Sequence, residues 1–135
     1  MDFDLVIIGS GPGGYVAAIR GAQLGLNVAI VEKEALGGIC LNWGCIPTKS
    51  FLRSAEVLKI IKSSEKYGIK SELGHVDIRE VVKRSRSIAS RLSNGVQYLL
   101  KKNKVNIFYG EASFKSSKSI KIKAKNNQIK EISSE

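Results

Sequence analysis

The sequence has few cysteines and no long apolar run, and each absence excludes a class of protein. Its 135 residues contain two cysteines, too few for the disulfide framework of a small secreted domain. No segment approaches the roughly 18 consecutive apolar residues that a membrane-spanning helix requires. The residues before Leu5 resemble neither a signal peptide nor an arginine-rich transit peptide. We therefore expect a cytoplasmic α/β protein without a membrane partner.

Metal ligands are scarce as well. His75 is the only histidine, and it lies far along the chain from Cys40 and Cys45. Two sulfurs and one distant imidazole do not complete the four ligands of a zinc site. We therefore predict no metal site, and we interpret His75 as a surface or helix-capping residue, because a catalytic base must lie near the group it deprotonates.

Acidic residues are few in the second part of the chain, which raises the question of nucleic-acid binding. Residues 1–50 carry three basic and four acidic side chains, whereas residues 51–135 carry 19 basic and eight acidic ones. The lysine-rich stretches at 101–104 and 121–125 lack the interleaved aromatic residues that single-strand binders use for stacking. We interpret the charge as solvated surface; a basic nucleic-acid binder with a redundant nucleotide fold is the alternative.

The first 32 residues have the pattern of a βαβ unit. An apolar, β-branched run over 4–8 predicts a buried parallel strand. A glycine-rich turn follows over 9–14, and a helix with small residues is expected over 15–24. A second strand over 28–31 is closed by Glu32. Together these elements predict a Rossmann-like α/β fold with a parallel sheet and flanking helices.

Helices and then short strands are predicted for the rest of the chain. Apolar residues at helical spacing predict a helix from Ser50 to about Lys62. Asp77 and Glu80 have the form of a capping box, so a long helix should follow to about Lys102. A third strand and an antiparallel meander are then expected over 105–109, 112–114, 119–122 and 128–132.

The glycine-rich turn has the form of a dinucleotide-binding fingerprint. In Gly9-x-Gly11-x-x-Gly14 the first glycine allows the tight turn, the second lets a pyrophosphate approach the backbone, and the third packs the helix on the strand. The helix N-terminus offers free N–H groups to that pyrophosphate. Glu32 follows at about the spacing that places a carboxylate on an adenosine ribose. We predict a dinucleotide site, although the loop alone does not choose between FAD and NAD.

Cys40 and Cys45 are separated by four residues. This spacing allows an intrachain disulfide if the Cα atoms come within about 7 Å. A redox-active pair and two buried reduced thiols are both compatible with the spacing. The preceding dinucleotide unit favours the redox pair, because a thiolate beside a flavin can pass electrons to it. Cys45 precedes a predicted helix whose N–H groups favour a thiolate, and Lys49 adds positive charge one turn later.

Residues 37–50, GGICLNWGCIPTKS, resemble the redox signature of the pyridine nucleotide-disulfide oxidoreductases. The glycine loop and Glu32 match that family in order and spacing, and residues 105–112 are similar to its strand and glycine after the long helix. The Pro-Thr-Lys ending most resembles members that oxidise dihydrolipoamide with NAD as acceptor. The resemblance implies that this chain is an incomplete FAD-binding domain with a redox-active cysteine pair.

The resemblance also implies roles for individual residues. The cofactor-binding residues would be Gly9, Gly11, Gly14, Glu32, Lys33, Gly38, Cys40, Lys49 and Gly110. The three glycines would hold the FAD pyrophosphate, Glu32 the adenosine ribose, and Gly110 the region of the adenine. The catalytic residues would be Cys40, which exchanges with dihydrolipoamide, and Cys45, which contacts the flavin. Lys49 would lie near the flavin N5 and tune its electronics.

Members of this family are several times longer than this chain. They carry a second glycine fingerprint for NAD and a dimerisation domain with a His–Glu base, and neither is found in this sequence. We expect residues 1–135 to be the N-terminal part of the FAD-binding domain and not to turn over alone. The parent would be a homodimer that accepts a lipoyl domain within a 2-oxo acid dehydrogenase complex. Another disulfide oxidoreductase of the family and a non-catalytic, truncated FAD-binding product are the alternatives.

Overall fold

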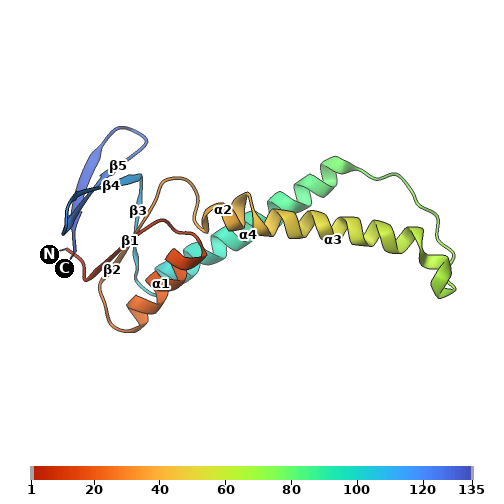
Figure 1. Ribbon diagram of the computed structural model, residues 1–135, viewed down its shortest axis with the longest axis horizontal. Coiled ribbons are helices and arrows are strands. Elements are labelled where there is room, and N and C mark those ends of the chain that lie inside the picture. Colours follow the sequence, from red (N-terminus) through yellow and green to blue (C-terminus); the bar gives the residue numbers. More distant parts are fainter. Residues whose placement is uncertain (1, 135) are drawn as a thin grey trace.

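An α/β body carries a long helical arm in the computed structural model, which describes residues 2–134 (Figure 1). The α/β fold, with a parallel sheet followed by an antiparallel meander, confirms the predicted fold class. The elements in chain order are β1 (Leu5–Ile8), α1 (Pro12–Gln23), β2 (Val28–Glu32), α2 (Gly38–Asn42), α3 (Cys45–Lys62), the 3₁₀-helix η1 (Ser64–Tyr67), α4 (Ile78–Lys102), β3 (Asn106–Tyr109), β4 (Glu111–Ser116), β5 (Ser119–Lys123) and β6 (Ile129–Ser133).

The body is organised around β2, the central strand of the parallel sheet. β1 and β3 pair with it on its two sides, so that Ile30 lies between Ile7 and Ile107. All five residues of β2 are buried. Ile30 packs into the core that α1 and α4 cover, and Val31 packs into the core that the meander covers. The sheet is therefore covered on both faces, which explains the near-continuous apolar sequence of β2.

α1 lies very close to the sheet. It begins at Pro12, three residues before the predicted start at Tyr15, because proline is accepted at the first helical position, where its missing N–H has no intrahelical partner. A Cβ at Gly21 would lie 3.1 Å from Leu5 Cδ2 and 3.2 Å from Val28 Cγ2. This close approach directs the N-terminus of α1 toward the carboxyl end of β1, where the glycine loop lies.

α3 forms one half of the arm and carries Cys45 at its root. It begins at Cys45, five residues before the predicted start at Ser50. Pro47 lies in the first turn, where a missing N–H does not interrupt the helix, and the Thr48 N–H donates to Gly44 O at 3.0 Å. The helix therefore starts at the second cysteine rather than after it.

α4 forms the other half of the arm and returns to the sheet. It runs side by side with α3 (Figure 1). Asp77 caps it as predicted, since its Oδ1 accepts from Arg79 N at 2.8 Å, whereas Glu80 pairs with Lys83. Leu100 anchors its last turns in the core. None of the helices within residues 2–134 combines the length and the apolarity needed to cross a bilayer.

The anchoring of α4 gives a stability prediction. Leu100 is 0% exposed and Leu99 is 43% exposed. We expect Leu100→Ala to lower the free energy of unfolding by about 2–5 kcal/mol, because it leaves a cavity between α4 and the sheet. Leu99→Ala, one position away on the solvent side, should cost less than about 1 kcal/mol. Urea unfolding followed by circular dichroism measures both, and equal losses would contradict this account of the core.

Candidate functional site

The glycine loop leaves an open cradle at the N-terminus of α1. A Cβ placed on Gly11 or Gly13 would meet no atom within 4 Å. Gly9 has a φ of +92°, a conformation that glycine adopts without strain. Gly14 packs so tightly that a Cβ there would lie 1.9 Å from Gly9 O. The first-turn N–H groups of α1 therefore border free space, which suits the close approach of a pyrophosphate.

The cysteine-bearing segment lies directly against this loop. A Cβ on Gly38 would lie 2.9 Å from Gly11 Cα, so the two backbones are in contact there. The Gly37 N–H donates to Ser10 O at 3.0 Å and to Ser10 Oγ at 3.2 Å. Ser10 is 0% exposed, so water does not compete for these bonds. The structure thus brings the predicted residues Gly11 and Gly38 together.

Glu32 ends β2 beside the same loop, with its carboxylate buried. Its Oε2 accepts from the N–H of Ser10 at 2.9 Å and from the Ser10 hydroxyl, and its Oε1 accepts from Glu34 N at 2.9 Å. Desolvation favours the neutral acid, but the hydrogen bonds from Ser10, Glu34 and Lys33 outweigh it and hold the pKa of Glu32 below its ordinary value of 4.5. The residue is therefore an anionic acceptor at the edge of the glycine loop.

A cavity of about 390 Å³ lies beyond Glu32 and contains two further predicted residues. Lys33 and Gly110 both line it, together with Tyr109 and the turn at Ala124. The Gly110 N–H donates to Glu32 O at 2.9 Å, which places the two residues side by side. The cavity lies next to Glu32, since Lys33 and Glu34, the two residues that follow it, are part of the lining, and its size suits an aromatic ring such as adenine.

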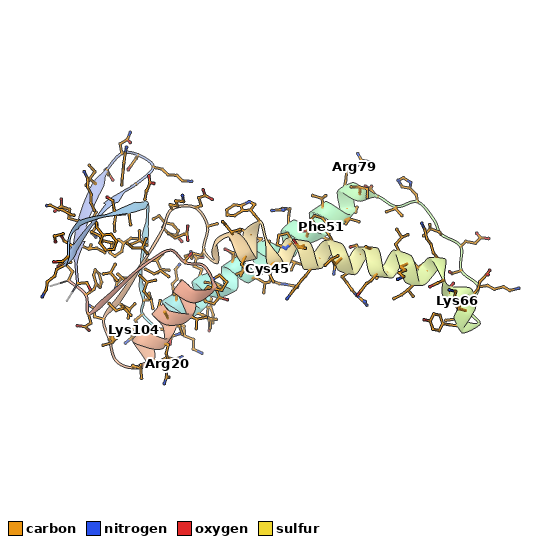
Figure 2. All side chains as sticks on the ribbon, in the orientation of Figure 1. Arg20, Cys45, Phe51, Lys66, Arg79 and Lys104 are labelled. Carbon is orange, nitrogen blue, oxygen red and sulfur yellow. The ribbon has the colours of Figure 1, made fainter. Side chains whose placement is uncertain are left out.

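The two cysteines face each other where the body meets the arm. Figure 2 shows Cys45 at this junction, at the start of α3. Cys40 lies in α2, and both cysteines are free thiols. Gly44 separates the two helices, and a Cβ on it would lie 3.1 Å from Ile39 O and 3.4 Å from Cys40 Cα. A larger residue at 44 would press against the backbone of Ile39 and Cys40.

The two thiols interact electrostatically. The hydrogen bond with the Cys45 thiol raises the pKa of Cys40, and desolvation and repulsion from Cys45 act in the same direction. The Cys45 N–H and the positive charge of Lys49 oppose this rise. Lys49 therefore lies within electrostatic reach of Cys40. The net effect is that the pKa of the Cys40 thiol lies above its ordinary value.

The two thiols differ in exposure. Cys45 is exposed and Cys40 is half-buried. The sequence resemblance assigns Cys40 as the exchanging thiol and Cys45 as the thiol that contacts the flavin. That order, and the thiolate expected at Cys45, stay predictions. His75 is exposed in the segment that joins α3 to α4.

Several residues of the site were not predicted from the sequence. Ser10 occupies a position that the glycine fingerprint leaves free, yet it connects the loop, Glu32 and Gly37. Arg86 and Ser93 of α4 donate to carbonyls of the cysteine segment. The sequence contains no local signal for these contacts, because the partners are 44 and 57 residues apart.

The sequence of this chain was compared with protein families and with known proteins. The family model for pyridine nucleotide-disulphide oxidoreductases matches residues 3–131. The chain belongs to this family. Within it, the chain is 60% identical over 112 residues to a dihydrolipoyl dehydrogenase of Rhizobium etli and 58% identical over 108 residues to one of Zymomonas mobilis. A dihydrolipoyl dehydrogenase of Chlorobaculum parvum is 45% identical over 130 residues.

These oxidoreductases are much longer than the chain. The matches cover 82%, 80% and 96% of this chain but 23%, 23% and 28% of the Rhizobium, Zymomonas and Chlorobaculum proteins. The chain thus spans about a quarter of the length of the relatives. The match across residues 3–131 includes the glycine loop, the cysteine segment, the arm and the meander, so all of these belong to one family unit.

The packing of the glycine loop gives a second prediction. Gly14→Ala should lower the free energy of unfolding by about 1–3 kcal/mol, because the new methyl group would collide with the Gly9 backbone. Gly13→Ala has open space and should be neutral or slightly stabilising, since alanine favours the helix. Thermal unfolding of the two variants provides the comparison, and a similar melting temperature for both would show that the loop is not packed as described.

The buried carboxylate of Glu32 gives a pH-dependent prediction. Its folded-state pKa is depressed, so its contribution to stability is present above the ordinary pKa of 4.5 and is lost as the pH falls through the folded-state value. Glu32→Gln should therefore lower the free energy of unfolding at pH 7 and lose this effect in acid. Urea titrations from pH 7 to pH 3 measure the difference, with Glu34→Gln as the exposed control. A pH-independent difference would contradict the prediction.

Proposed function

We propose that the chain is the FAD-binding, redox-disulfide segment of a dihydrolipoyl dehydrogenase. The contact between Gly11 and Gly38 carries the proposal, because it places a dinucleotide cradle against a segment with two cysteines. The names of the relatives support the substrate, since all three described above are dihydrolipoyl dehydrogenases. Residues 1–135 are then the N-terminal part of the FAD-binding domain, and the NAD and dimerisation domains belong to the remaining length of the parent.

The residues present fit FAD. The open side of Gly11 and Gly13 accommodates the pyrophosphate, and the N-terminus of α1 is complementary to its charge. Glu32 would accept from the adenosine ribose, and the cavity at Lys33 and Gly110 would take the adenine. The remaining ring system would extend toward the cysteine segment. When bound, FAD supplies the two-electron acceptor for the reduced cysteine pair, and NAD is the final acceptor in the parent.

The cysteines perform thiol–disulfide exchange with the dithiol. In the oxidised pair, a dihydrolipoamide thiolate attacks Cys40 Sγ, the disulfide bond breaks, and its electron pair leaves on Cys45 Sγ. The second thiolate of the substrate then attacks its own sulfur in the mixed disulfide and releases Cys40. The dithiol is oxidised to lipoamide and gives up two protons, and the cysteine pair takes up the electron pair. One of these protons is taken up at Cys40 Sγ, whose pKa is raised by its contact with Cys45, and the other passes to solvent, so that Cys45 Sγ keeps the negative charge.

The positive charge of Lys49 supports this chemistry. Lys49 lies one turn beyond Cys45 on α3 and lowers the pKa of the Cys40 thiol electrostatically. A cation at this place stabilises whichever sulfur of the pair carries the negative charge. In the parent it would also lie near the flavin. The side chain therefore acts on the charge distribution of the pair rather than as a proton donor.

The parent's partners follow from the same proposal. Dihydrolipoamide is carried by the lipoyl domain of a 2-oxo acid dehydrogenase complex. The parent would act there as a homodimer in the cytoplasm, where thiols remain reduced.

Another disulfide oxidoreductase of the family is the second candidate for the function. The Pro47–Lys49 ending and the names of the relatives favour the first. A truncated FAD-binding product without catalysis is the third candidate, which the dithiol reaction distinguishes.

The test is reduction of bound FAD by the dithiol. The 135-residue chain, loaded with FAD and oxidised, should lose its visible flavin absorbance when dihydrolipoamide is added without oxygen. Cys45→Ser should slow this by about 100-fold or more, because no disulfide can form, while dithionite should still reduce its flavin. No NADH should form from this chain. Failure to bind FAD, or equal reduction of the wild type and Cys45→Ser, would overturn the proposal; reduction by glutathione instead of dihydrolipoamide would favour the second candidate.

A further inference from the structure

α4 holds the cysteine segment by side-chain hydrogen bonds. Arg86 Nη1 donates to Asn42 O at 2.9 Å, and Ser93 Oγ donates to Leu36 O at 2.8 Å. The two donors are seven residues apart, which is about two helical turns, so both lie on one face of α4. Ala89 lies between them and is 4% exposed. α2 and α4 are in contact along this face.

Asn42 connects the two contacts into one network. Its Nδ2 donates to Leu36 O and to Gly38 O, both at 3.0 Å. Leu36 O therefore receives one hydrogen bond from within the segment and one from Ser93. Asn42 lies between Cys40 and Cys45 in the sequence. Its backbone carbonyl accepts a hydrogen bond from Arg86. The position of α2, and with it Cys40, is thus fixed relative to α4.

We propose that Arg86 and Ser93 are positioning residues that set the reduction potential of the Cys40–Cys45 pair. They hold α2 against α4 and so keep the two sulfurs at a high effective concentration in the dithiol form. The proposal rests on the proposed function in one respect: it takes the two cysteines to be a redox pair. It assigns no contact with substrate or cofactor to either residue.

The geometry fixes the sign of the effect. A disulfide already joins α2 to α3, so the clamp adds little constraint to the oxidised form. The dithiol form lacks that link, and its sulfurs separate more easily once the clamp is removed. Loss of the clamp therefore favours the dithiol and makes the potential more positive. A purely electrostatic role for Arg86 would have the opposite sign, because removing a cation disfavours the thiolate.

The charge acting on Cys40 is that of Lys49 on α3, and the Arg86 guanidinium binds Asn42 O. Arg86 therefore acts mainly by holding the position of α2 and not by its charge.

The size of the effect is limited by water. A cavity of about 300 Å³ borders the clamp formed by Arg86 and Ser93, and its lining includes both residues and Trp43. Water can enter it and replace part of a lost hydrogen bond. The effect should accordingly be about tenfold in the disulfide equilibrium, which is about 30 mV for a two-electron couple.

The experiment is a redox titration of the full 135-residue chain with glutathione. One oxidised glutathione and the two thiols give the Cys40–Cys45 disulfide and two reduced glutathiones, so the equilibrium constant follows from the fraction oxidised. Rapid alkylation and mass spectrometry measure that fraction. Arg86→Met should lower the constant for disulfide formation about tenfold, and Ser93→Ala should lower it about threefold. Arg86→Lys keeps a donor and should stay closer to the wild type.

Arg91 provides the matched control on the same helix. It is exposed, and its side chain makes no hydrogen bond with the cysteine segment in the described structure. Arg91→Met should therefore leave the constant unchanged. A merely structural role would lower the thermal stability of both redox forms equally and leave the constant of Arg86→Met at the wild-type value, which would overturn the inference. A shift to a tenfold higher constant would overturn it too, in favour of the electrostatic role.

The same titration separates this inference from the proposed function. If the wild-type chain forms no Cys40–Cys45 disulfide at any glutathione ratio, the proposed redox function is wrong and the inference falls with it. If the wild type forms the disulfide and neither Arg86→Met nor Ser93→Ala changes the constant, only the inference is wrong. Should Arg86→Met fail to fold, Ser93→Ala carries the same test.

Discussion

The buried hydroxyl of Ser10 is the interaction on which the site depends. It donates to Glu32 and accepts from the Gly37 N–H, so one side chain connects the glycine loop, the acid that ends β2 and the start of the cysteine segment. Ser10 is 0% exposed, and a buried polar group that loses its partner costs about 1–3 kcal/mol. These bonds therefore favour one arrangement of the three segments. The close approach of Gly38 to Gly11 follows from that arrangement.

The rest of the fold supports this junction from two directions. β2, buried on both faces, fixes the end from which Glu32 projects. α4 crosses from the arm to the sheet, with Leu100 in the core at one end and Arg84 bound to Ser50 of α3 at the other. The cysteine segment contacts both the glycine loop and α4. The body and the arm meet at α2 and the start of α3 (Figure 1), the two helices that carry the cysteines.

Local spacing was enough to predict the elements and most of the candidate site. The glycine loop, Glu32 and the Asp77 cap are features whose chemistry depends on neighbours within a few residues or one βαβ unit. Apolar spacing places the start of α3 at Ser50, whereas the helix begins at Cys45, because the first turn holds Pro47 and few apolar residues and so adds nothing to that spacing. Ser10, Arg86 and Ser93 were missed because their roles arise from packing between segments distant in the sequence. No periodicity or motif encodes such contacts.

The central claim is that the cofactor cradle and the cysteine pair form one site. Trp43, the only tryptophan, lies between the two cysteines and is 52% exposed, so its fluorescence reports on what binds there. We would titrate the chain with FAD and with ADP-ribose while recording Trp43 emission. The account predicts saturable quenching by FAD, and much weaker quenching by ADP-ribose, which lacks the flavin. Stoichiometric FAD binding that leaves Trp43 emission unchanged would place the flavin away from the cysteines and contradict the account.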